Sequence, residues 1–194
     1  MAIVDLQDKV NQLYSTPSDI NEHIPTILKY GQECNHITEM GVRWVVSTWA
    51  WLASSPTKLI SYDLFHPSHW NANITDVEET AKAYSLDFEF IQADVLKLEI
   101  EETDLLFIDT WHTYDQLQAE LKLHAQKVRK YICFHDTTSF EYVDEPLHHE
   151  NSWGKPTSGK GIWPAIEEFL QENPSWQLKE RYTNNNGFTI IERV

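Results

Sequence analysis

Five short apolar runs, each ending at an acidic residue, limit what this chain can fold into more than any other feature. The runs lack clear alternation of apolar and polar residues, which is typical of strands buried on both faces of a parallel sheet. Helical patterns fill most of the gaps between them. This order predicts an α/β fold with a doubly wound, mostly parallel sheet. The runs cover residues 36–39, 59–63, 88–94, 105–109 and 131–136.

The predicted helices lie ahead of the first strand and between the later ones. An N-terminal helical segment is placed at 1–34, and within it residues 18–30 carry isoleucine and leucine at helical spacing behind a Ser18 and Asp19 cap. Thr75 and Thr113 each begin a capping box, so a helix is expected to open at each of them. The helices expected between the strands cover 42–54, 75–85 and a segment that opens at residue 113.

The chain after residue 136 changes character. Residues 137–161 show no periodicity and hold several glycines, which predicts a long loop that we interpret as a lid over a site. Pro164 is expected at the first position of a helix that ends at 173–174.

The C-terminal region carries a hairpin signal. Two strand-like segments, 176–182 and 188–193, flank Asn-Asn-Asn-Gly at 184–187. An antiparallel hairpin is therefore expected to complete the parallel sheet. With 194 residues, the chain is expected to form a single domain over 1–194.

Charge and cysteine content exclude several classes of partner and compartment. Thirty acidic and fifteen basic residues give a formal net charge of −15, which disfavours nucleic acid and anionic membranes as partners. No signal peptide or membrane span is apparent, and the two cysteines, Cys34 and Cys133, cannot form a disulfide-dense scaffold. A cytoplasmic location is expected.

The acidic residues that end the five runs should meet at one edge of the sheet. Ligands of open α/β sheets bind at the carboxyl ends of the strands. Loop capping can account for one or two such carboxylates, but five together favour a site for a cation or for several hydroxyl and amine donors. These residues are Glu39, Asp63, Asp94, Asp109 and Asp136.

The turn after the first run points away from dinucleotides. It contains Gly41 but lacks the further glycines that a pyrophosphate site needs. Residues 154–160 match most of a phosphate loop, but Gly161 replaces its Ser or Thr and no strand precedes it. A ligand with a positive charge and no phosphate fits better, and S-adenosylmethionine (SAM) meets both conditions.

Several motifs together resemble a known family. They are ITEMGVR at 37–43, SYD at 61–63, QAD at 92–94, LFIDTWHTYDQLQAEL at 106–121 and YICFHDT at 131–137. Over residues 20–194 the chain resembles class I SAM-dependent methyltransferases. It is similar to the small O-methyltransferase-like group that includes cephalosporin-hydroxylase-type and macrocin-type proteins. The resemblance implies a Rossmann-like methyltransferase fold.

The resemblance also implies roles for the acidic residues. Glu39 and Gly41 match the first motif, where the glycine turn contacts the methionine part of the cofactor. Asp63 matches the acid that binds both ribose hydroxyls, and Asp94 the acid near the adenine amine. Asp109 matches a residue of the cofactor site that in metal-dependent members also binds magnesium, with His135 and Asp136 at the positions of its companions.

Two residues depart from the family pattern within the site. Val45 stands where a second glycine is common, and His135 stands where an acidic residue is more frequent. The identity of the divalent cation, Mg²⁺ or another, is therefore left open. Arg129 and Lys130 replace a Pro-Gly-Gly turn before the fifth run.

Three side chains near the expected ion site have alternative readings. His112 is predicted to act with Asp109 in catalysis as a general base, because an imidazole titrates near neutral pH; the alternative is a histidine bonded to its loop. His135 and Asp136 are neighbours, so they can reach one ion only if the strand ends or bends there. Otherwise His135 is a packing residue.

Three functions remain open at this point. The leading expectation is SAM-dependent O-methyl transfer to a small hydroxylated acceptor, such as a sugar or secondary metabolite. The second is a metal-dependent hydrolase or oxygenase that uses the Asp and His residues. The third is a catalytically silent, SAM-binding-like module. A homo-oligomer is left open as well.

Overall fold

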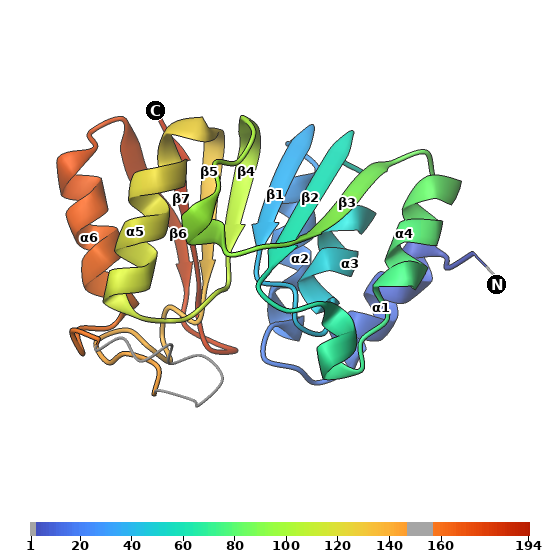
Figure 1. The fold of residues 1–194 in the computed structure, drawn as a ribbon, viewed down its shortest axis with the longest axis horizontal. Coiled ribbons are helices and arrows are strands. Elements are labelled where there is room, and N and C mark those ends of the chain that lie inside the picture. The colour runs from blue at the N-terminus through green and yellow to red at the C-terminus, as the bar shows by residue number, and fades with distance from the viewer. Residues whose placement is uncertain (1–2, 147–156) are drawn as a thin grey trace.

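The computed structural model describes residues 3–146 and 157–194, and its centre is a seven-stranded sheet (Figure 1). The strand order is β3-β2-β1-β4-β5-β7-β6, and β7 runs antiparallel to both of its neighbours while the other pairings are parallel. The predicted α/β class and mostly parallel sheet are confirmed. The strands are β1 His36–Met40, β2 Lys58–Asp63, β3 Asp87–Gln92, β4 Thr103–Ile108, β5 Val128–His135, β6 Trp176–Tyr182 and β7 Phe188–Arg193.

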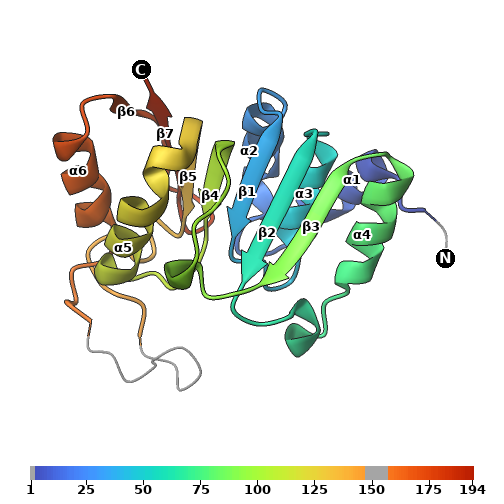
Figure 2. The ribbon, with the colours of Figure 1, turned by 45° about the horizontal axis from the view of Figure 1, so that its top comes forward.

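Helices cover both faces of the sheet, as Figures 1 and 2 show. The first four pack with one apolar cluster and the last two with the other. The described residues also include four short 3-10 helices, at Asn21–His23, Pro67–Trp70, Val95–Lys97 and Ala125–Lys127. The helices are α1 Leu6–Ser15, α2 Ile24–Gly31, α3 Val46–Ala53, α4 Ile74–Ala83, α5 Tyr114–His124 and α6 Ile162–Glu172.

Three predicted helix starts were wrong by a few residues. The helix placed at 42–54 begins at Val46, because the residues before it form the turn after β1. The cap of α4 is Asn73 and not Thr75, since the Asn73 side chain accepts from the Thr75 amide. In α6, Pro164 is the third helical residue and not the first.

The N-terminal helical prediction was correct in type but not in its start. The segment after Ser18 and Asp19 first makes a 3-10 turn, and α2 begins only at Ile24. Thr113 caps α5 as expected, because its hydroxyl accepts from the Gln116 amide.

The C-terminal hairpin is confirmed at both strands. Its turn uses positive φ angles at Asn185, Asn186 and Gly187, and Asn186 O accepts the amides of Thr138 and Ser139. The amide of Glu22 donates to Asn185 Oδ1 at 3.0 Å. The turn therefore joins the N-terminal segment to the start of the predicted lid.

Both cysteines, Cys34 and Cys133, are free and buried. No helix within residues 3–146 and 157–194 is long and apolar enough to cross a membrane.

Candidate active site

The turn after β1 lies at the carboxyl edge of the sheet. The strand order reverses here, because β2 lies on one side of β1 and β4 on the other. Gly41 has a φ of +94°, and a Cβ atom there would lie 1.9 Å from the carbonyl oxygen of Asp109. Only glycine permits this approach of two backbones. The predicted glycine position is thus required by the contact with β4.

Two other residues of this turn have positive φ angles although neither is glycine. Val45 has a φ of +58° and Arg43 one of +42°. A β-branched residue in the left-handed region is strained, and such strain persists only where the surroundings enforce it. Val45, which stands where the resemblance expects a glycine, therefore holds a backbone conformation that glycine adopts more readily.

Asp63, the predicted ribose ligand, holds this turn in place. Its Oδ2 accepts the amides of Val42 and Arg43 at 2.8 and 3.0 Å, and its Oδ1 accepts the Phe65 amide at 2.9 Å. A carboxylate offers about four acceptor positions. About one therefore stays open for a ligand in this conformation.

Glu39 lies inside the protein, beneath the edge of the sheet. It is 0% exposed, and its two oxygens accept the hydroxyls of Ser47 and Ser61 at 2.6 Å each. Burial raises the pKa of Glu39 to about 7, against the effect of these hydrogen bonds. Its side chain therefore links β1 to Ser47 of α3 and Ser61 of β2.

Asp94, the predicted adenine ligand, caps the 3-10 turn after β3. Its Oδ1 accepts the Leu96 amide at 3.0 Å, and its Oδ2 lies 3.0 Å from Lys97 Nζ. Of the five acids, Asp109 and Asp136 alone share a group of possible metal ligands among the described residues.

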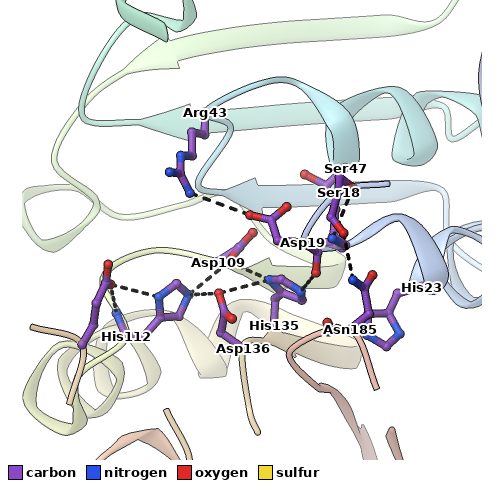
Figure 3. Close-up of polar contacts among 12 residues, drawn as sticks. Ser18, Asp19, His23, Arg43, Ser47, Asp109, His112, His135, Asp136 and Asn185 are labelled. Carbon is purple, nitrogen blue, oxygen red and sulfur yellow. Dashed lines mark hydrogen bonds and ion pairs between the residues drawn. The ribbon is translucent and has the colours of Figure 1, made fainter. Parts of the chain in front are cut away.

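Asp109 and Asp136 do meet, and two histidines lie beside them (Figure 3). Nε2 of His112 is 3.1 Å from Asp109 Oδ1 and 3.2 Å from Asp136 Oδ2. Nδ1 of His135 is 3.2 and 3.4 Å from the same two oxygens. We call these four residues the Asp–His cluster.

The end of β5 explains how neighbouring side chains reach one place. The strand stops at His135, and Asp136 takes a φ of +59°. This left-handed residue turns the chain, so the alternation of strand side chains no longer applies. The condition set by the sequence for His135 and Asp136 is met.

The outer nitrogen of each histidine is bound to an acceptor. Nδ1 of His112 is 3.0 Å from Glu145 Oε2, and Nε2 of His135 is 3.0 Å from the carbonyl oxygen of Asp19. Such contacts fix the tautomer and orient the other ring nitrogen, a common arrangement in metal-binding histidines. The inner nitrogens, Nε2 of His112 and Nδ1 of His135, both face the carboxylates.

Electrostatics favour charged forms throughout the Asp–His cluster. Burial would lower the pKa of His112, but hydrogen bonds to Asp109 and Glu145 outweigh it and raise the pKa to about 10. Burial acts likewise on His135, and the Asp109 charge holds its pKa well above the usual value. Burial would raise the pKa of Asp109, but the His135 charge keeps it well below its ordinary range. Without an ion, His112 is therefore a cation near neutral pH.

Ligand atoms of Asp109, His112 and Asp136 all lie within 4.8 Å of one another, which is close enough to hold one metal ion. Two carboxylates with imidazole suit Mg²⁺, Mn²⁺ or iron. The sequence placed His135 in this set and gave His112 a different role. The structure places both imidazoles against the carboxylates.

The described parts of the predicted lid are tied to the site. Asp144 is buried and accepts the amides of Tyr114, Gly159 and Gly161 at 3.0, 2.6 and 2.8 Å. Residues 147–156, the remainder of the predicted lid at 137–161 and the start of the phosphate-loop-like stretch, lie outside the described residues.

Sequence reasoning missed Asp19, Asp144 and Glu145 as residues of the site. Glu145 binds both the His112 ring and, at 3.2 Å, its amide. Asp144 and Glu145 lie in a segment without periodicity, and the sequence predicts a helix cap at Asp19, so no sequence signal pointed to the site.

Comparison with solved structures finds methyltransferases. The O-methyltransferase from Bacillus cereus, in complex with S-adenosylhomocysteine (SAH), has a TM-score of 0.60 at 14% identity, covering 100% of this chain and 93% of that one. The SAH-bound methyltransferase from Podospora anserina has a TM-score of 0.56 at 17% identity, covering 97% and 87%. The N-terminal domain of EvdMO1, in the presence of SAH and D-fucose, has a TM-score of 0.54 at 13% identity, covering 93% and 84%.

These similarities establish the Rossmann-like methyltransferase fold expected from the sequence. No family model and no curated protein matches the chain.

Proposed function

We propose that this protein is a SAM-dependent methyltransferase that transfers the methyl group to an oxygen of a small hydroxylated acceptor, assisted by a divalent cation. The observation that carries the proposal is the Asp–His cluster beside the Gly41 turn, at the carboxyl edge of a methyltransferase fold. Solved structures of similar fold contain SAH, and one was determined with a sugar present.

The turn and Asp63 fit a SAM site in part. Gly41 brings the turn close to Asp109, and one acceptor position of Asp63 is open to a ribose hydroxyl. Binding both hydroxyls, as the resemblance implies, requires one amide of the turn to release Asp63. SAM, when bound, supplies a methyl group activated by the sulfonium charge.

The Asp–His cluster fits a divalent cation. Asp109 and Asp136 supply oxygens, and the inner nitrogens of His112 and His135 face them. The acceptors Glu145 and the Asp19 carbonyl orient the two imidazoles. When bound, the cation makes a nearby hydroxyl more acidic.

His112 cannot act as an ion ligand and as a base at the same time. Its Nε2 can hold the ion, or it can accept the acceptor's proton. The raised pKa of His112 disfavours it as a base near neutral pH in the ion-free protein. The short distances to both aspartates favour the ligand role.

The test is calorimetric titration of the purified protein with SAM, after EDTA treatment and again with added Mg²⁺ or Mn²⁺. We expect saturable SAM binding in both states and saturable ion binding by the protein. Absence of SAM binding in both states would reject the methyltransferase proposal.

One observation favours a second function, a metal-dependent hydrolase or oxygenase without SAM. Three of the acceptor positions of Asp63 are already taken, two by the turn after β1 and one by the Phe65 amide, while the Asp–His cluster forms without a cofactor. This alternative predicts ion binding and no SAM binding, so the same titration separates the two. A silent SAM-binding-like module would bind SAM and show no turnover.

A further inference from the structure

A small cavity lies beside the Asp–His cluster, between the sheet and helices α5 and α6. The centre of a water molecule can move within about 10 Å³ of this cavity, which gives room for about one water. His112 and His135 form part of its wall, and the apolar part comes from Ile108, Leu117, Phe134 and Ile162. The cavity therefore adjoins the site and extends away from it into the α5 and α6 layer.

Two residues of the cavity wall, Glu120 and Trp111, carry unpaired polar atoms. Glu120 is 0% exposed, and its Oε1 accepts from Thr110 Oγ1 at 2.6 Å and Gln116 Nε2 at 2.7 Å. Its Oε2 has no hydrogen-bond partner within the described ranges, and neither does the buried Nε1 of Trp111. Buried polar groups are normally paired, so both atoms point to a missing partner.

The chemistry of these two atoms selects that partner. The indole N–H of Trp111 can only donate. Burial raises the pKa of Glu120 to about 7, and once ionised its carboxylate can only accept. One group that pairs with both must donate and accept, as a hydroxyl does. An ammonium cannot accept from Trp111, and an anion would meet the Glu120 charge.

We propose that this cavity is a hydroxyl-binding subsite, filled by water in the free protein and by one hydroxyl of the acceptor in the complex. The identity of that acceptor rests on the proposed function. A space that holds about one water has no room for a hydroxyl together with a transferred methyl group. The acceptor therefore carries at least two hydroxyls, one that Glu120 and Trp111 hold and one that reacts at the Asp–His cluster.

The test follows the Trp111 indole N–H by nitrogen–proton NMR in EDTA-treated protein without SAM. The probe is benzyl alcohol, and toluene and benzylamine are matched compounds that lack the hydroxyl. We expect benzyl alcohol to shift the Trp111 signal saturably. Toluene and benzylamine should bind at least about ten-fold more weakly. Trp111→Phe identifies the signal by removing it.

Variants test the acceptor atom. Glu120→Gln places an N–H where Oε2 accepts, so benzyl alcohol should bind about ten-fold more weakly. Glu168→Gln is the control, since Glu168 bonds to Tyr114 outside the cavity wall. Trp176→Phe removes another buried, unpaired indole that does not line the cavity, and it should leave binding unchanged.

Equal binding of toluene or benzylamine would overturn the hydroxyl assignment, and so would full affinity in Glu120→Gln. A high-resolution crystal structure with a dry cavity would also overturn it. The same sample is then titrated with SAM. Alcohol binding without SAM binding would reject the proposed function and keep the subsite, and the reverse result would reject the subsite alone.

Discussion

A Cβ atom on Gly41 would lie 1.9 Å from the backbone carbonyl oxygen of Asp109. The turn after β1 and the end of β4 therefore touch through backbone alone. The amide of Asp109 also donates to Met40 O at 2.8 Å, so the two segments are fixed to each other just ahead of the Asp–His cluster.

Gly41→Ala should destabilise the protein strongly, because it adds a steric clash to a left-handed backbone. We expect the free energy of unfolding in urea to fall by about 2–4 kcal/mol. Gly159→Ala is the matched control: its φ is +74°, but no atom lies within 4 Å of the added carbon. It should lose only about 1–2 kcal/mol. Equal losses would show that the turn can move away from Asp109.

Glu39→Gln should change how stability depends on pH. Burial raises the pKa of Glu39 from 4.5 to about 7. Between these values the folded state binds more protons than the unfolded state, so the free energy of unfolding falls as pH rises. Removing Glu39 should remove a decline of about 3 kcal/mol across this window.

The measurement is urea unfolding at about pH 5 and about pH 8. The free energy of unfolding of Glu39→Gln, measured relative to that of the parent protein, should be larger at the higher pH than at the lower pH. Glu120, whose pKa burial also raises to about 7, keeps part of the slope in the variant. Glu79→Gln, at an exposed position of α4, is the control. Parallel profiles for parent and Glu39→Gln would contradict the prediction.

Asp144→Asn should loosen the described parts of the predicted lid. The carboxylate accepts three backbone amides, and these bonds hold its pKa below the ordinary value against the effect of burial. We expect a loss of about 1.5–3 kcal/mol in the free energy of unfolding and faster amide exchange at 157–161. Asp115→Asn, which removes the charge from an acceptor of the Ser158 amide alone, should have a small effect. Unchanged exchange in Asp144→Asn would show that other contacts hold the loop.

Asp63→Ala should weaken SAM binding by about 1.5–3 kcal/mol, the range for a hydrogen bond to a charged group. Calorimetry measures this loss. Part of it would come from the turn, because Asp63 also holds the amides of Val42 and Arg43. Asp63→Asn keeps one acceptor oxygen and should lose less. SAM affinity equal to that of the parent in the alanine variant would remove Asp63 from the cofactor site.

His112→Ala should distinguish a metal ligand from a base. As a ligand, its loss should weaken Mn²⁺ binding about 10- to 100-fold, and His135→Ala should do the same. As a base only, its loss should leave ion affinity intact and slow turnover, once an acceptor is known. His69→Ala is the control, since His69 lies in the 3-10 turn after β2 and outside the Asp–His cluster.

The sheet was predictable because buried strands leave a strong hydrophobic signal. The meeting of Asp109 and Asp136 was predictable for the same reason, since adjacent parallel strands end at one edge. Glu39 behaves differently because β1 continues to Met40. Its side chain therefore points to the α3 face and not to the edge.

Helix starts and loop contacts were less predictable. Asn73 and Thr75 are both good caps, and sequence alone does not choose between them. Asp144 and Glu145 reach the site only because the loop folds back onto α5, which depends on tertiary contacts and not on local preference.

The position of β7 affects the order in which the strands can pair during synthesis. This strand lies between β5 and β6, although it follows both of them in the sequence. During synthesis, β5 must wait with an unpaired edge until residues 188–193 leave the ribosome. Contacts such as Glu22 to Asn185 join segments separated by 163 positions, so they close late. A nascent chain in which synthesis has not reached β7 exposes the unpaired edge of β5, and chaperones should bind it there.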